Sequence, residues 1–190
     1  MGARPPHGAV ELFNGHPTQL LKAARLTNSG LLMEGTETSQ PYTSFQLHLE
    51  FRLPFMPRAR GQARANSGVY LQSRYEVQIL DSFGLAGKNN ECGGLYKTLD
   101  PSINMCLPPL SWQTFDIDHT ASTVDGNGKQ KTPAVLTIRH NGVLIHDQYI
   151  VPPTPASANP LPHRNPLPGR LFLQQHGNPV RYRNIWVVER

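Results

Sequence analysis

The stretch Ala65–Asp81, ANSGVYLQSRYEVQILD, decides the fold class of this chain. It predicts two adjacent β-strands that meet near Ser73 and Arg74, because short apolar–polar runs stand on both sides of that point. Glu76 and Gln78 share one face of the second strand, since side chains two residues apart point the same way. An ordinary half-exposed strand has the same alternation, so a second observation is needed before this face is interpreted as a site.

A distant strand repeats this polar alternation and supplies that observation. In LQQHG, residues 173–177, Gln174 and His176 alternate in the same manner. The clearest strand of all is FQLHLEFRL, residues 45–53, in which every odd position is apolar and every even position polar. That pattern predicts an antiparallel sheet with one packed and one solvated face, and it makes His48 a solvent-facing residue.

The remaining chain also predicts short strands separated by turns. Asn141-Gly142 is the strongest hairpin signal, and it joins strands at 134–140 and 143–150, which makes the nearby His140 and His146 surface residues. At least eight short strands, no long helix and many Gly and Pro residues favour an all-β, two-sheet antiparallel sandwich. We expect a single domain over residues 1–190, with a flexible tail at 1–8 and a Pro-rich loop at 152–168.

Composition limits the classes of partner. The 190-residue chain has a net charge of +5 and only 16% charged residues, without a basic helix or an aromatic-lined basic groove. Nucleic-acid binding is therefore disfavoured. No apolar run reaches the roughly 18 residues that span a membrane, and residues 1–6 lack the apolar segment of a signal peptide.

The two cysteines frame a long loop between predicted strands. Cys92 and Cys106 stand within residues 82–111, which exceed the usual length of a structureless loop. In an exported protein we expect them to form one disulfide, worth about 3 kcal/mol in the chain-entropy model. In a reducing compartment they would be two inert thiols.

A set of motifs, taken in order, resembles a known family. The motifs are LFNG (12–15), the alternating strand FQLHLEFRL (45–53), NSGVY (66–70), YEVQILD (75–81), CGGLY (92–96), WQTFDI (112–117), HNGVLIHD (140–147), LQQHG (173–177) and RNIWV (183–187). Together they resemble the bacterial 3-keto-disaccharide hydrolase domains, from about residue 10 to the C-terminus. The chain departs from that family at Gln175, where members usually carry an acid or another polar residue, and in the long loop at 152–168.

The resemblance implies a jelly-roll sandwich of the concanavalin A-like lectin and glucanase type. It also implies an exported protein, periplasmic or extracellular and in some cases part of a longer multidomain chain. The implied substrates are oligosaccharides or glycosides whose sugar is already oxidised at carbon 3.

Four functions are open for this chain and its polar residues. An elimination at a 3-keto sugar needs one base, for which Glu76 and His176 are candidates, with Gln78, Gln174 and Arg183 as hydrogen-bond donors. A divalent metal ion held by Glu76 and His176 would serve the same chemistry.

The other classes use the same surface differently. A glucanase-like hydrolase would need Glu76 and Asp81 as a carboxylate pair, brought to one face by a β-bulge. A non-catalytic carbohydrate-binding module would use aromatic platforms such as Tyr70, Tyr96 or Trp112, and a structural module would have no pocket.

We expect one cleft on the curved face of the larger sheet to collect these residues. The predicted catalytic residues are Glu76 and His176, and the predicted substrate-binding residues are Asn66, Tyr70, Gln78, Asp81, Gln174 and Arg183, with Asp81 at the edge of the cleft.

Overall fold

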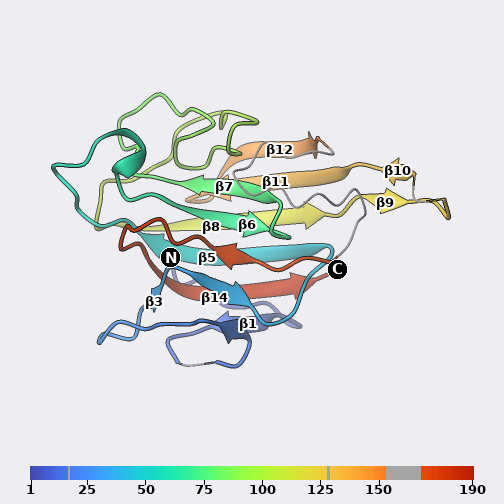
Figure 1. Cartoon of the computed structure of the whole chain (residues 1–190), viewed down its shortest axis with the longest axis horizontal. Coiled ribbons are helices and arrows are strands. Elements are labelled where there is room, and N and C mark those ends of the chain that lie inside the picture. Colours follow the sequence, from blue (N-terminus) through green and yellow to red (C-terminus); the bar gives the residue numbers. More distant parts are fainter. Residues whose placement is uncertain (17, 128, 153–167) are drawn as a thin grey trace.

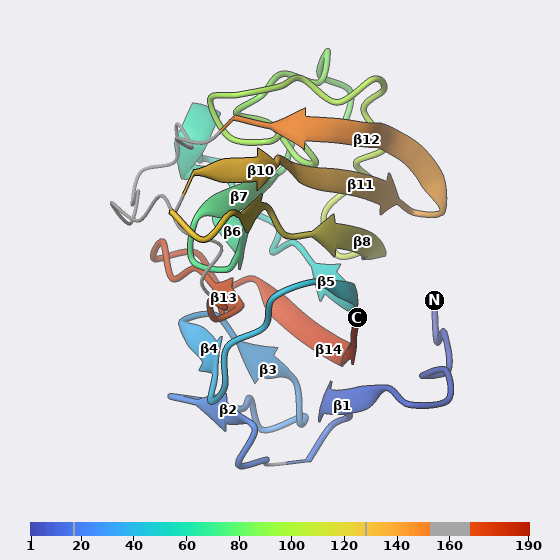
Figure 2. The same cartoon turned by 90° about the vertical axis from the view of Figure 1, so that its right-hand side faces the viewer.

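The strands form two facing antiparallel sheets, as the alternating patterns predict (Figures 1 and 2). The computed structural model describes residues 1–16, 18–127, 129–152 and 168–190. The seven-stranded sheet contains β1 (Val10–Phe13), β3 (Leu32–Met33), β5 (Phe45–Arg52), β8 (Trp112–Thr120), β11 (Ala134–His140), β12 (Val143–Val151) and β14 (Arg181–Glu189). The five-stranded sheet contains β2 (Leu21–Lys22), β4 (Thr36–Thr38), β6 (Ser67–Leu71), β7 (Tyr75–Ile79) and β13 (Phe172–Leu173).

Two small elements complete the described part of the chain. β9 (Thr123–Val124) and β10 (Gln130–Thr132) pair as a separate ribbon. One 3₁₀ turn, Gly61–Ala63, is the only helical element among the described residues. The predicted Pro-rich loop lies almost entirely outside the described residues, because 153–167 are not described.

The core lies between the sheets and follows the predicted alternation. β5 pairs with β8 so that Leu49 stands opposite Phe115, and both are fully buried. The rings of Phe51 and Phe115 approach to 4.8 Å between centroids. Val69 on β6 and Val77 on β7 bring the inner face of the other sheet into the same apolar cluster. The two sheets thus share one continuous apolar core.

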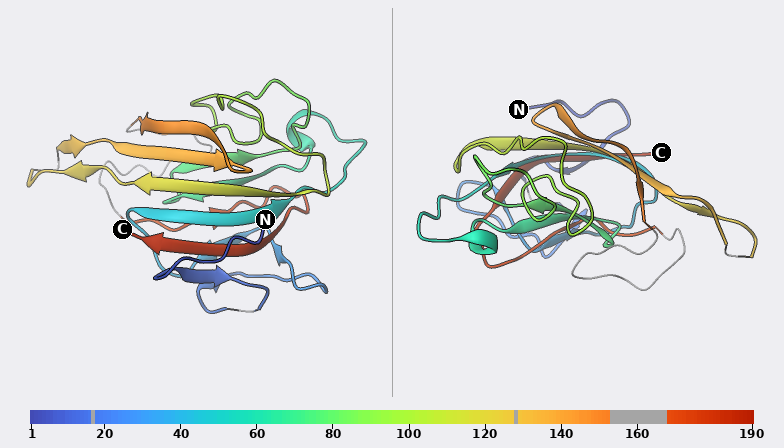
Figure 3. Two further views of the ribbon diagram at one scale, coloured as in Figure 1. Left: turned by 180° about the vertical axis from the view of Figure 1, so that it is seen from behind. Right: turned by 90° about the horizontal axis from the view of Figure 1, so that it is seen from above.

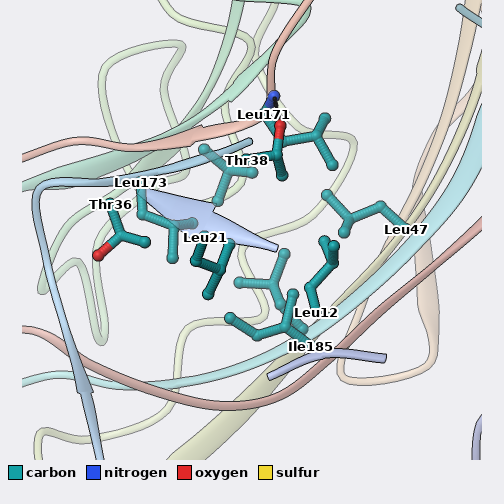
Figure 4. Close-up of a pocket in the computed structure, with 10 residues that line it drawn as sticks. Leu12, Leu21, Thr36, Thr38, Leu47, Leu171, Leu173 and Ile185 are labelled. Carbon is teal, nitrogen blue, oxygen red and sulfur yellow. Dashed lines mark hydrogen bonds between the residues drawn. The ribbon is translucent and has the colours of Figure 1, made fainter. Parts of the chain in front are cut away.

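An apolar cavity remains in this core, and it is too small to bind a ligand (Figure 4). Its volume is about 20 Å³. Eight of its lining residues are labelled in the close-up: Leu12, Leu21, Thr36, Thr38, Leu47, Leu171, Leu173 and Ile185. Since about 10–15 Å³ of such space holds one water molecule, this cavity has room for no more than one, and it is a packing defect and not a binding site.

The outer face of β5 differs from the solvated face that we predicted. His48 is 1% exposed and Glu50 is fully buried, because neighbouring side chains and the first residues of the chain cover them. The N-terminal residues are therefore not a free tail: the Gly2 amide donates to Glu50 Oε1, and Asn184 Nδ2 donates to the Ala3 carbonyl.

The two histidines beside the β11–β12 hairpin are also buried, against prediction. His140 packs on Phe115 with 4.7 Å between ring centroids and donates from Nε2 to Gln113 Oε1 at 3.0 Å. Burial lowers the pKa of His140 to about 3, so the ring is neutral. His146 donates from Nε2 to the Gly93 carbonyl at 2.7 Å. Both side chains hold the hairpin against its neighbours, and neither is exposed to solvent.

The cysteine pair is close together but not bonded in this structure. Cys92 and Cys106 are free thiols, both buried, and their side chains interact by a hydrogen bond. Burial and the neighbouring Cys106 raise the pKa of Cys92, while the hydrogen bond from Cys92 lowers the pKa of Cys106. The structure holds the pair as reduced thiols, and their oxidation to a disulfide in an exported protein stays a prediction.

Candidate functional site

The candidate site lies on the outer face of the five-stranded sheet. β6 and β7 pair with Gly68 opposite Gln78 and Tyr70 opposite Glu76, and these side chains face away from the core. Gln174 follows β13 and lies beside them, because its backbone N–H donates to the Gly68 carbonyl at 2.9 Å. The pocket that results is lined by Gln62, Asn66, Glu76, Gln78, Tyr96, Gln174 and His176.

The long loop after β7 forms one wall of this pocket. Its backbone runs beside β7: the Gln78 amide donates to the Gly94 carbonyl, and the Tyr96 amide to the Glu76 carbonyl, each at 2.9 Å. The loop thereby covers the exposed edge of β7 and carries Tyr96 into the pocket. Within the loop the structure has isolated bridges, Val77 with Leu95 and Leu95 with Leu99.

Glu76 is the only carboxyl group among the described lining residues of this pocket. It is 3% exposed, and Tyr70 donates a hydrogen bond from its hydroxyl to Oε2 at 2.9 Å. Burial raises the pKa of Glu76 to about 7, although the Tyr70 hydrogen bond and the charge of Lys97 act in the opposite direction. A carboxyl group with this pKa exchanges protons readily near neutral pH.

A glycine makes room for the Glu76 carboxylate. A Cβ atom on Gly68 would lie 2.3 Å from Glu76 Oε1 and 2.9 Å from its Cγ. The side chain of Glu76 therefore lies flat against the backbone of β6 at the one position that has no side chain. Tyr70 holds its other oxygen, and Gln174 Nε2 donates to the Tyr70 hydroxyl at 3.2 Å.

Two buried amide oxygens in the pocket have no partner. Gln78 Nε2 donates to Gln62 Oε1 at 3.0 Å, and Gln174 Nε2 donates to the Tyr70 hydroxyl, so both amide nitrogens are in use. Oε1 of Gln78 and Oε1 of Gln174 are buried without a hydrogen-bond partner. We expected the side-chain amides of Gln78 and Gln174 to donate hydrogen bonds to a ligand. In the structure their nitrogen atoms already donate within the protein, and the oxygen atoms, which are acceptors, are the ones without a partner. They match a ligand rich in hydroxyl donors.

The predicted residues are collected only in part. Asn66, Tyr70, Glu76, Gln78, Gln174 and His176 do come together, on the smaller sheet and not on the larger one. Arg183 lies on β14 in the other sheet, where its Nε donates to Glu50 Oε2 at 2.7 Å. Asp81 follows β7 and is not part of the pocket lining, and the register of β6 and β7 is regular from Tyr75 to Ile79, so no bulge within β7 brings Asp81 to the face of Glu76.

Two lining residues were missed as site residues. Gln62 lies in the 3₁₀ turn and accepts from Gln78, while Tyr96 had been considered only as an aromatic platform. Neither lies on a strand, so no alternation in the sequence could place it. His176 is exposed at the rim.

A metal centre would depend on few protein ligands. Among the described residues, no group of three or more His, Cys, Asp or Glu side chains could hold a metal ion. Glu76 and His176 both line the pocket, and they would be two ligands of any ion bound between them.

Comparison with known proteins places this geometry in context. A family model described as the 3-keto-α-glucoside-1,2-lyase-like domain matches residues 8–188. A crystal structure from Parabacteroides distasonis ATCC 8503, reported as a "putative glycosyl hydrolase", is 29% identical, with a TM-score of 0.85 over 97% of this chain and 85% of that chain. No curated protein matches.

More distant structures share the fold alone. A second structure from the same Parabacteroides strain, also reported as a "putative glycosyl hydrolase", is 19% identical, with a TM-score of 0.64 over 96% of this chain and 99% of that chain. The alginate lyase Aly36B, solved with an alginate tetrasaccharide, is 10% identical, with a TM-score of 0.55 over 99% of this chain and 98% of that chain. No helix in the described ranges has the length and apolar character to cross a membrane.

Proposed function

The chain belongs to the family of 3-keto-α-glucoside-1,2-lyase-like domains, and from that premise we propose that it cleaves the glycosidic bond of 3-keto glycosides by elimination followed by hydration. The observation that carries the proposal is the single buried carboxyl group of the pocket, Glu76, with a pKa of about 7. Elimination next to a ketone needs one base, whereas direct hydrolysis of a glycoside needs two carboxyl groups about 5–10 Å apart.

The proposed chemistry balances without a further reagent. Glu76 removes the proton from carbon 2, which the ketone at carbon 3 acidifies, and the electron pair moves through the enolate to form the bond between carbons 1 and 2. The group at carbon 1 leaves as an alkoxide and takes up a proton. Water then adds across the double bond, and the products are the 3-keto sugar and the free alcohol.

The pocket divides the supporting roles between acceptors and donors. The free Oε1 atoms of Gln78 and Gln174 accept hydrogen bonds from sugar hydroxyls and orient the ring over Glu76. His176 at the rim and Tyr96 on the loop carry the proton donors for the enolate oxygen and the leaving group. A divalent ion bound by Glu76 and His176 would supply stabilisation of the enolate charge.

The cavity beside Glu76 is small, which constrains the way a sugar enters. Its volume is about 50 Å³. Since one water molecule needs about 10–15 Å³ of such space, the cavity has room for only a few waters, and one edge of a sugar ring fits inside. We therefore place the edge with carbons 2 and 3 against Glu76 and the leaving group outside, toward His176.

The pH dependence of activity follows from the state of Glu76. The base must be ionised, so kcat/KM for a 3-keto disaccharide should rise about tenfold per pH unit below pH 7 and level off above it. Tyr70→Phe removes a hydrogen bond that lowers the pKa of Glu76, so the rising, acid limb of the pH–rate profile should move to higher pH in the variant. A pH–rate profile of both proteins checks this, and a flat profile from pH 5 to 9 would contradict the assignment.

The proposed function is tested by a comparison of substrates. The protein is offered a 3-keto disaccharide and the parent disaccharide, each with and without a chelator. Turnover of the keto sugar alone supports elimination, and turnover of the parent sugar would overturn it in favour of ordinary glycoside hydrolysis. Binding of both sugars without turnover would indicate a carbohydrate-binding module. Loss of turnover with the chelator, restored by a divalent metal, would add a metal ion to the mechanism.

A further inference from the structure

A second hollow lies on the outer face of the seven-stranded sheet. The seven-stranded and five-stranded sheets lie face to face, so their outer faces point to opposite sides of the molecule (Figures 2 and 3). Its volume is about 330 Å³, which is within the range of about 300–1,000 Å³ of small-ligand pockets. It is lined by Met1, Ala3, His48, Leu107, Thr114, Asp116, Asn141 and Gly142. The proposed chemistry at Glu76 uses none of these residues.

Buried ionisable groups lie beneath this hollow. His48 Nδ1 donates to Asp116 Oδ1 at 2.6 Å, and the His48 ring stacks on Trp186 with 5.0 Å between centroids. Glu50 is fully buried and accepts from Arg183 Nε at 2.7 Å, and these hydrogen bonds lower its pKa although burial alone would raise it. Groups of this kind are seldom buried on the outer face of a sheet, because their desolvation is costly.

The backbone of β14 is distorted at the same place. The pairing of β14 with β5 shifts register between Arg183 and Trp186, and Asn184 has a φ of 47°, in the left-handed region. The distortion directs Asn184 Nδ2 toward Glu50 Oε1 at 3.1 Å and the Ala3 carbonyl at 3.0 Å. Bulges and left-handed non-glycine residues concentrate next to binding sites, where they re-aim a side chain.

The lining determines the chemistry of a ligand. The side chain of Asp116 is 34% exposed, so the carboxylate that fixes His48 also reaches the hollow as an acceptor. Thr114 contributes a hydroxyl, Leu107 an apolar wall, and no Lys or Arg belongs to the described lining. Such a site suits an uncharged molecule with several hydroxyl donors and a partly apolar ring face, and it repels anions.

We propose that this hollow is a second saccharide-binding site, specific for neutral sugars and separate from the Glu76 pocket. Asp116 accepts hydrogen bonds from adjacent sugar hydroxyls, and His48, held between Asp116 and Trp186, positions that carboxylate. The site binds a sugar without cleaving it, so that a longer saccharide or a surface glycan is retained on one face while the pocket on the other face remains free.

The two tryptophans of the chain provide a selective test. Both lie on this face: Trp186 under His48, and Trp112 with the Arg183 guanidinium 4.0 Å above its ring. The Glu76 pocket has no tryptophan among its described lining residues. Maltose, as a neutral probe, should therefore change the tryptophan fluorescence saturably, whereas glucuronate at the same concentrations should not.

Variants assign the signal to the hollow. Asp116→Ala should weaken maltose binding about tenfold or more, because a hydrogen bond to a charged group is lost. Asp118→Ala, on the same strand and paired with Arg190 at 2.7 Å, is the matched control and should leave the affinity unchanged, as should Glu76→Gln. The absence of a saturable signal, equal affinity in Asp116→Ala with an unchanged circular dichroism spectrum, or loss of the signal in Glu76→Gln would each overturn the proposal.

Discussion

Glu76→Gln is expected to lower kcat for a 3-keto disaccharide by about 10²–10⁴-fold, the usual contribution of a positioned general base. The amide has the same shape as the carboxylate and still accepts a hydrogen bond from Tyr70, so the fold should be kept. It removes a carboxyl group that burial holds near neutral pKa, and so it should also not reduce the melting temperature. Steady-state kinetics and a thermal melt of the same preparation measure both effects.

Asp81→Asn is the matched control for this experiment. Asp81 is two residues beyond the end of β7 and outside the described lining of the pocket, so elimination by one base predicts a change of no more than a few-fold. If Asp81→Asn lost activity as severely as Glu76→Gln, a pair of carboxyl groups would be at work and the one-base mechanism would fail. If neither variant lost activity, the catalytic group would lie elsewhere.

The fold was predictable because each long strand carries its own alternation. The residues of β5 that are apolar in the sequence face the core, and Asn141-Gly142 does form a hairpin. The exposure of the opposite faces was not predictable. His48 and Glu50 are covered by the first residues of the chain and by β14, and such contacts between distant segments leave no period in the sequence.

The same distinction applies to the site. Glu76, Gln78, Gln174 and His176 were predicted because they alternate on strands or directly after them, and the structure brings them to one pocket. Arg183 was wrongly assigned because strand alternation gives a face but not the sheet to which a strand belongs. Tyr96 depends on the path of a long loop, which only the backbone contacts with β7 determine.

Gly68→Ala should lower kcat about 10²-fold with little loss of stability, because a displacement of about 1 Å at a reacting group has an effect of this size. The new Cβ atom would stand 2.3 Å from Glu76 Oε1, so the carboxylate must leave its place against β6. The atoms that clash are the end of a flexible side chain, which can turn outward without moving the backbone. Burial is the largest cause of the raised pKa of Glu76, so the acid limb of the pH–rate profile should move below pH 7 as the displaced carboxylate meets water.

The shift of the pH profile separates displacement of Glu76 from general damage to the sheet. Gly126→Ala is the matched control: no atom lies within 4 Å of a Cβ atom there, and kcat, the pH profile and the melting temperature should all stay unchanged. A Gly68→Ala protein that melts normally and keeps full activity with an unchanged profile would show that the carboxylate need not lie against β6. Activity that falls only in proportion to the folded fraction would show that Gly68 serves the sheet alone. Loss of kcat in a fully folded protein, with the acid limb moved to lower pH, is the result that follows if a buried Glu76 is the base.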